Sequence, residues 1–97
     1  METQVDTLLE GLKIDLGIMG TTVYDVRLLS YLQAAMDAIR QEGATTISPS
    51  VPLDAQLIIM YAAWTWRKRD SMEAMPRMLR WKLNNRIFAE KAGGGSG

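Results

Sequence analysis

The fold of this chain is decided by residues 52–70, which read PLDAQLIIMYAAWTWRKRD. Pro52 suits the first turn of a helix, because proline needs no amide hydrogen there and its fixed φ is already helical. Nine of the ten residues in 57–66 are apolar, with Thr65 as the exception. Apolar side chains therefore point in every direction around this helix, and such a helix is buried on all sides. We expect a central helix over residues 52–69 that the rest of the chain, or a neighbouring subunit, surrounds.

Three more helices are predicted around the central one. Their apolar residues recur every three to four positions, which is the spacing that gives a helix one buried face. Gly17 and Gly43 end the first two of these helices, and Pro76 opens the last. Thr22 and Asp25 have the spacing of a capping box at the start of the second. The expected helices cover residues 4–16, 23–42, 52–69 and 76–92.

The chain has the length of one domain. A chain of 97 residues buries about 60–65% of its unfolded surface, which is enough for one modest core. The loop over residues 44–51 contains Ser-Pro-Ser, which ends any extended segment. We therefore predict an all-α fold, a compact bundle of about four helices with a short loop between helices 2 and 3. Residues 1–92 form this single helical domain, and the Gly/Ser sequence of residues 93–97 is predicted to be a flexible tail.

Two residue types are missing from the composition, and their absence excludes much catalytic and metal chemistry. The chain has no cysteine and no histidine, so a zinc finger, a disulfide framework and a Ser-His-Asp or Cys-His nucleophile are all excluded. Carboxylates alone remain for acid–base work. Asp6 and Glu10 stand one helical turn apart, but exposed acids at this spacing are typical of a solvated helix face. We expect no enzyme activity, no cofactor and no bound metal.

No segment of the sequence indicates a membrane or a secretion signal. The longest uninterrupted apolar run covers residues 57–64, whereas a spanning helix needs about 20 residues. Residues 1–4 carry no basic side chain, unlike the start of a signal peptide. We therefore expect no membrane partner.

The net charge is zero, but the two halves of the chain differ in sign. Residues 1–54 contain three basic and eight acidic side chains, and residues 55–97 contain eight basic and three acidic ones. Such an asymmetry is typical of a basic surface for nucleic acid, or of head-to-tail association in which the acidic face of one copy meets the basic face of the next. Two ends that are merely solvated would give the same pattern.

Basic and aromatic residues are interleaved from the end of the central helix onward. Arg67, Lys68 and Arg69 are consecutive cations, more than a helix C-terminus needs to balance its dipole. Trp81 and Phe88 lie seven positions apart, so they share one side of the last helix while its leucines occupy another. This pattern indicates a helix with one core face and one partner face. The predicted contact residues are Trp64, Trp66, Arg67, Arg69, Arg77, Arg80, Trp81, Arg86 and Phe88.

Four segments, taken in order, carry a resemblance to a known family. They read Leu8-Leu9-x-x-Leu12-Lys13-Ile14-Asp15, Asp25-x-x-Leu28-Leu29-x-x-Leu32-x-x-Ala35-Met36-x-x-Ile39, Tyr61-x-x-Trp64-x-x-Arg67-x-Arg69-Asp70 and Met75-Pro76-x-x-Leu79-Arg80-x-x-Leu83. Over about residues 5–90 this order resembles the small all-helical head–tail connector proteins of long-tailed bacteriophages, the adaptor or head-completion proteins.

The resemblance implies a structural role. Such proteins form a ring of identical subunits, such as a dodecamer, that docks on the portal protein and extends the DNA channel. The ring offers a platform to the next neck or tail-completion protein, while double-stranded DNA passes without sequence specificity. The resemblance thus implies a protein of the virion neck, made in the cytoplasm of the bacterial host, that catalyses nothing.

Three other interpretations of the sequence are possible. A small DNA-binding protein of the helix-turn-helix type, with a packaging or regulatory role, would use the cations of residues 67–69 and 77–86. A regulatory helical bundle would bind one partner protein through the methionine-rich surface of residues 72–78. A carboxylate enzyme is the third, and the sequence contains no assembled acid–base set for it.

Overall fold

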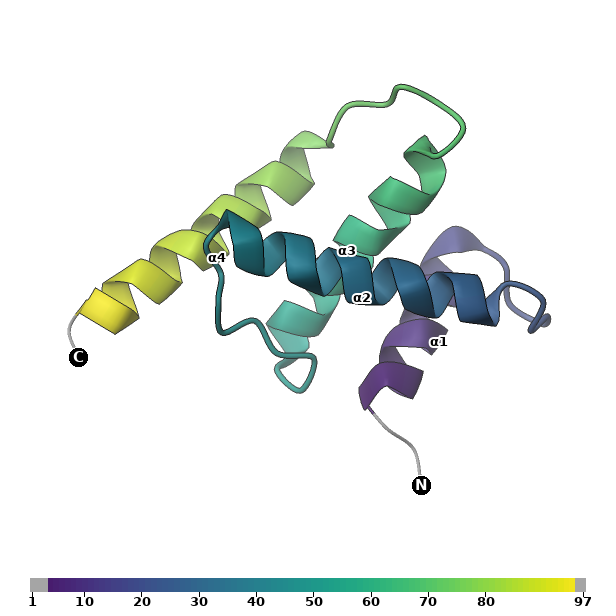
Figure 1. Cartoon of the computed structure of the whole chain (residues 1–97), viewed down its shortest axis with the longest axis horizontal. Coiled ribbons are helices and arrows are strands. Elements are labelled where there is room, and N and C mark those ends of the chain that lie inside the picture. Colours follow the sequence, from purple (N-terminus) through teal and green to yellow (C-terminus); the bar gives the residue numbers. More distant parts are fainter. Residues whose placement is uncertain (1–3, 96–97) are drawn as a thin grey trace.

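The computed structural model describes residues 4–95, with side chains described as far as residue 93, and all of its regular structure is helical. Figure 1 shows the four helices and their order along the chain. The predicted all-α fold is confirmed for the part of the chain that the structure describes. The helices are α1 (Gln4–Leu16), α2 (Asp25–Glu42), α3 (Pro52–Lys68) and α4 (Arg77–Gly95).

The helix α3 lies at the centre of the fold and packs against each of the other three helices. None of residues 57–66 is exposed to solvent. The side chains of Leu57, Ile58 and Ala62 are buried, and those of Ile59 and Met60 are half-buried against the core. The other three helices therefore cover most of this apolar segment, and half of its residues remain partly accessible.

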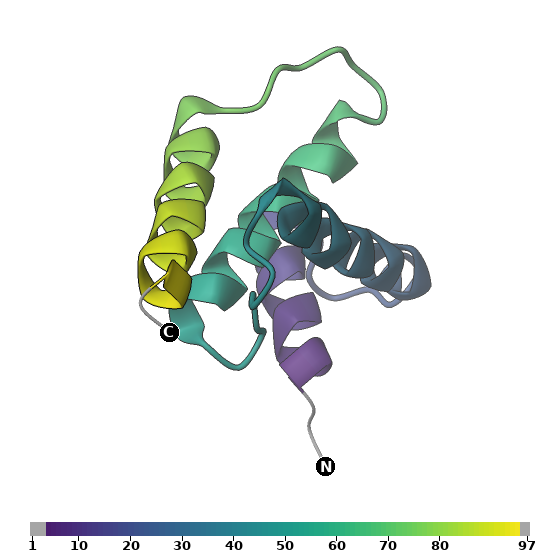
Figure 2. The same cartoon turned by 60° about the vertical axis from the view of Figure 1, so that its left-hand side comes forward.

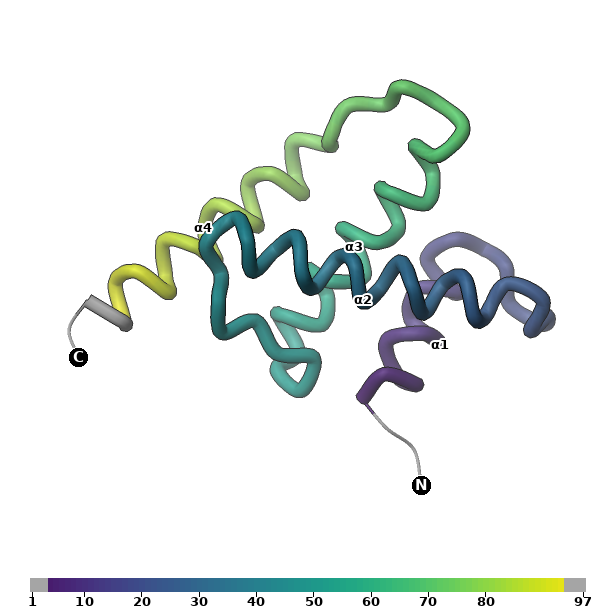
Figure 3. The backbone as a smooth tube through the Cα atoms, viewed as in Figure 1, coloured from purple at the N-terminus to yellow at the C-terminus, as the bar shows by residue number. Residues whose placement is uncertain are grey.

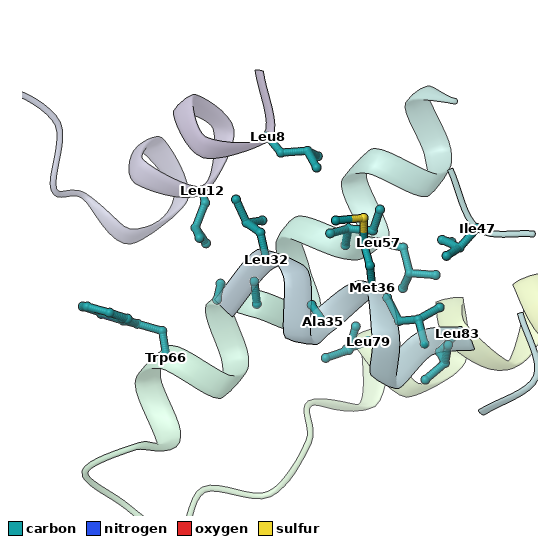
Figure 4. Packing of buried hydrophobic residues seen from close by; sticks show 14 of the residues in the cluster. Leu8, Leu12, Leu32, Ala35, Met36, Ile47, Leu57, Trp66, Leu79 and Leu83 are labelled. Atoms are coloured by element: carbon teal, nitrogen blue, oxygen red, sulfur yellow. The ribbon is translucent and has the colours of Figure 1, made fainter. Parts of the chain in front are cut away.

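The core is built where leucines of the surrounding helices meet α3. Leu8 and Leu12 reach it from α1, while Leu32 reaches it from α2, and Figure 4 shows these side chains converging. Each fully buried leucine stabilises the fold by about 1.5–3 kcal/mol relative to an exposed one. The α4 helix adds Leu79 and Leu83 at the far end of the same cluster.

The start of α2 differs from the prediction. The helix begins at Asp25 rather than near residue 23, and its N-cap residue Tyr24 makes no side-chain capping bond. The Thr22–Asp25 capping box does not form. Asp25 pairs instead with Lys13 of α1, with Nζ and Oδ1 2.9 Å apart, so its carboxylate joins two helices rather than capping one.

The end of α2 requires glycine. Gly43 has a φ of 130°, a conformation that other residues rarely adopt. A Cβ atom at this position would also lie 3.0 Å from Cγ2 of Ile87 on α4. Residues 43–51 then lead into α3, and Ala44 and Ile47 are buried on the way.

The helix α4 is reached by an extended connector. Figure 3 shows the backbone of residues 69–76 arching from the end of α3 to the start of α4. The helix then runs to Gly95, three residues beyond the predicted end, because an established helix adds one hydrogen bond for each further residue. Residues 93–95 of the predicted tail are therefore helical, and residues 96 and 97 lie outside the described residues, as do residues 1–3.

The molecule is a flat slab with extents of 46 × 38 × 17 Å. Figures 1 and 2 agree that α4 forms one side of the slab, with α3 in the middle and α1 on the side opposite α4. Ion pairs join the two halves of unlike charge within the chain, because Asp15, Glu42 and Asp54 of the first half bind Arg67, Arg80 and Arg86 of the second.

Candidate interaction surface on the fourth helix

Two aromatic side chains of α4 point into solvent. Trp81 is 61% exposed and Phe88 is 73% exposed, although both are among the largest apolar residues of the chain. Successive residues of a helix are turned by about 100°, so positions seven apart nearly coincide in direction. Trp81 lies about 200° around the helix from Leu79, which is buried in the core. We call the surface formed by Arg77, Trp81 and Phe88 the outward face of α4.

A shallow apolar groove runs beside this face, where α4 meets the start of α3. It has a volume of about 280 Å³ and is lined by Leu53 and Leu57 of α3 and by Trp81 and Ala89 of α4. Leu53 is exposed on the rim of the groove. The apolar surface of the outward face therefore continues onto the neighbouring helix.

A buried ion pair fixes the direction in which α4 presents this face. The guanidinium of Arg86 donates from Nε to Oδ1 of Asp54 at 2.7 Å and from Nη2 to Oδ2 at 3.3 Å. Asp54 is only 4% exposed, and its Oδ2 also accepts the amide hydrogen of Ser48 at 3.1 Å. The hydrogen bonds and charge of Asp54 raise the pKa of Arg86 above its usual value. This pair ties α4 to the first turn of α3.

Glu90 extends the same cluster to the α2–α3 loop. Its Oε1 lies 3.2 Å from Nη1 of Arg86. The amide hydrogens of Thr45 and Thr46 are donated to its two oxygens at 2.8 and 2.9 Å, and both threonine hydroxyls donate as well. Bonds from the Thr45 hydroxyl and the Thr46 amide lower the pKa of Glu90 to about 2. The carboxylate stays charged above that pH and keeps loop and helix together.

Trp66 was predicted as a contact residue, but in the structure it belongs to the core. It is only 6% exposed and packs edge-on against Tyr24 and Tyr31, with ring centroids 5.8 and 5.2 Å away. The guanidinium of Arg69 lies over the face of the ring, with Cζ 3.9 Å from the ring centroid. Arg69 also donates to the Trp66 carbonyl oxygen at 2.6 Å, so this arginine binds a carbonyl group at the C-terminal end of α3.

Trp64 holds the α3–α4 connector. Its Nε1 donates to the carbonyl oxygen of Glu73 at 3.3 Å, and its ring packs edge-on against Tyr61. The ammonium of Lys68 lies 4.2 Å from the ring centroid. The side chain is half-buried, so most of its contacts are within the chain rather than available to a partner.

Besides Arg69, three of the predicted contact arginines form ion pairs or hydrogen bonds within the chain. Arg67 donates to the carbonyl oxygen of Asp15 at 3.1 Å and lies 3.5 Å from its carboxylate, which joins α3 to α1. Arg80 binds Glu42 at 2.9 Å and joins α4 to the end of α2. Arg86 belongs to the buried cluster, and its prediction as a contact residue is also corrected.

The structure thus brings three of the nine predicted residues onto one free surface. Arg77, Trp81 and Phe88 share the outward face of α4, and within residues 4–95 Arg77 makes no ion pair. Sequence reasoning missed Leu53, whose place beside α4 depends on the tertiary fold. It also missed the partners of Arg86, although Arg86 and Glu90 stand four positions apart, a spacing at which opposite charges on a helix can pair.

Comparison of the chain with protein-family models, with curated proteins and with solved structures finds no match. Within residues 4–95, no helix combines the length and the apolar character needed to cross a membrane. In the same part of the chain, acidic side chains do not gather into a group that could hold a metal ion. What the described surface offers chemically is apolar contact bordered by positive charge.

Proposed function

We propose that this protein is a structural subunit of a tailed bacteriophage virion, one copy in a ring at the head–tail junction. In this proposal the ring docks on the portal protein, extends the DNA channel and connects the head to the next neck or tail-completion protein. The protein is made in the host cytoplasm and acts in the neck of the virion. Its work is mechanical, and no catalytic step belongs to it.

The observation that carries the proposal is the outward face of α4. Large aromatic residues are depleted from free surfaces and enriched where proteins meet. Trp81 and Phe88 are exposed on a helix whose opposite side is fixed by Leu79, Leu83 and the Arg86–Asp54 pair. Because these contacts hold one side of α4 against the core, its other side is left as a contact surface. An assembly subunit needs such a surface, because preformed contacts cost less to order on binding.

The arrangement of charge favours a ring over an isolated pair. The outward face of α4 carries the cation Arg77, and the exposed acid Glu10 lies on α1, so a contact between unlike faces of identical subunits is favourable. Repeating one such contact either closes a ring or extends a filament. The resemblance to head–tail connectors favours the ring over the filament.

The DNA-binding alternative receives less support from these contacts. A recognition helix reads base edges with a polar face, whereas α4 turns tryptophan and phenylalanine outward. Arg67, Arg80 and Arg86 are occupied by Asp15, Glu42 and Asp54. These three cations are therefore less available to neutralise phosphates than the sequence alone suggests.

Negative-stain electron microscopy of the concentrated protein tests the proposal, together with a DNA-binding titration. We expect closed rings with a central opening, and weak binding to duplex DNA that is the same for unrelated sequences. A compact two-fold dimer that binds duplex DNA tightly at low salt would contradict the connector and favour the DNA-binding protein.

A further inference from the structure

The outward face of α4 has a complement elsewhere on the same chain. A second groove of about 360 Å³ lies between α1 and α3. Its lining is mainly apolar, and Ile14, which borders it, is 58% exposed. The apolar lining residues are Gly11, Ile14, Pro52, Ala55, Ile59 and Met60.

The charges beside the two surfaces are opposite. Glu10 lies one turn before Ile14 on α1 and is exposed, whereas Asp15, which lines the groove, is already paired with Arg67 of the same chain. Arg77 and Lys91 are exposed at the two ends of the outward face of α4. An apolar ridge bordered by cations and an apolar groove bordered by the acid Glu10 are therefore complementary in charge.

We propose that the outward face of α4 in one copy docks into the α1–α3 groove of the next copy. This inference rests on the proposed ring, and it names the lateral contact from which the ring is built. Trp81 and Phe88 are the anchors, and a cation at one end of the outward face lies toward Glu10. At their observed exposures the two aromatic side chains offer roughly 300 Å² of the ~800 Å² that a stable interface buries per partner.

A symmetric pairing of the outward faces is less favourable. A symmetric α4–α4 contact would place Arg77 and Lys91 of both copies together, while the nearby acid Glu90 is turned inward to Arg86 and the threonines. Like charges across an interface suppress this arrangement.

The positions of the two surfaces make the contact repeatable. The groove is lined by α1 and α3 and the outward face belongs to α4, so the two surfaces share no residue and each copy can use both at once. A contact between different surfaces of identical subunits propagates from copy to copy, and a ring results when the rotation closes.

Thiol-specific crosslinking tests this contact cleanly, because the natural chain has no cysteine. One variant carries Asn85→Cys, an exposed position beside Trp81 and Phe88, and a second, tagged variant carries Ile14→Cys. The two variants are mixed and treated with a short bismaleimide. A third variant, Gln33→Cys on the exposed surface of α2, is the control partner for Asn85→Cys.

We expect a crosslinked pair that contains one Asn85→Cys and one Ile14→Cys chain, at a yield at least 10-fold above the Gln33→Cys control. Trp81→Ala in the first variant should reduce this yield by about 10-fold, the loss typical of an aromatic anchor. A crosslink between two Asn85→Cys chains would overturn the proposal in favour of symmetric pairing, and a yield equal to the control would overturn it as well. If rings form while this crosslink fails, the docking assignment is wrong and the connector proposal stands. If no oligomer forms at all, both are wrong.

Discussion

The buried pair of Arg86 and Asp54 makes the sharpest prediction about stability. Replacing Arg86 by methionine keeps most of the apolar stem but leaves a carboxylate that is 4% exposed without its cation. Removing one partner of a buried pair costs about 3–5 kcal/mol, because the remaining charge is stranded. Here the amide of Ser48 still binds Asp54, and the Arg86 side chain is partly exposed. We therefore expect a loss of about 2–4 kcal/mol in the free energy of unfolding.

Such a loss is large for a chain of this size. A domain of 97 residues has a total stability of roughly 5–15 kcal/mol. One kcal/mol shifts the Tm of a 60–100-residue domain by about 4–8 °C, so Arg86→Met should lower the Tm by at least about 8 °C. The assay is thermal and urea unfolding followed by circular dichroism, and the matched control is Arg27→Met at an exposed position of α2. The control should change stability by no more than about 0.5 kcal/mol.

The double variant Asp54→Leu/Arg86→Met separates the pair from its parts. With both charges removed, no buried carboxylate is stranded, and the loss should be smaller than that of Arg86→Met alone. An Arg86→Met protein that unfolds within 0.5 kcal/mol of the natural chain would refute the view that this pair fixes α4 to α3.

Three further predictions concern the cluster, a turn and the tryptophans. The pKa of Glu90 is lowered from 4.5 to about 2, so its stabilising contribution is complete above about pH 4.5 and is lost as the pH falls toward 2. In acid unfolding, the stability difference between the natural chain and Glu90→Gln should therefore shrink over this pH range, and a constant difference would contradict the assignment. Gly43→Ala should destabilise by about 1–3 kcal/mol in urea unfolding, because φ is 130° and the new Cβ would crowd Ile87; an unchanged midpoint would be the opposite result. Trp66→Ala should cost about 3–5 kcal/mol as a core truncation, whereas Trp81→Ala should cost less than about 1 kcal/mol, and equal losses would show that the two environments are assigned wrongly.

The local pattern of the sequence predicts the helices well because each one depends on short-range features. Pro52 and the apolar run of residues 57–66 define the central helix, and Gly43 ends α2 where the periodic pattern stops. The exposed positions of Trp81 and Phe88 follow from their seven-residue spacing and from the leucines opposite them. These features need no knowledge of which helix packs beside which.

The roles of the other predicted contact residues depend on tertiary neighbours. Arg86 resembles any exposed helix cation in the sequence, and only the fold places it against Asp54, 32 positions earlier. Trp66 could belong to the core or to an interface until Tyr24 and Tyr31 are seen to enclose it. The capping box before α2 failed for the same reason, since Lys13 attracts the Asp25 carboxylate away from the helix terminus.

The native mass of the natural chain tests the central claim most directly. Light scattering after size exclusion would be measured over a concentration series, once at about 50 mM and once at about 1 M salt. We predict a closed oligomer of one size at low salt that dissociates as salt screens the charges bordering Trp81 and Phe88. A single monomeric mass at every concentration and both salt levels would contradict the claim that the outward face of α4 joins one copy to the next.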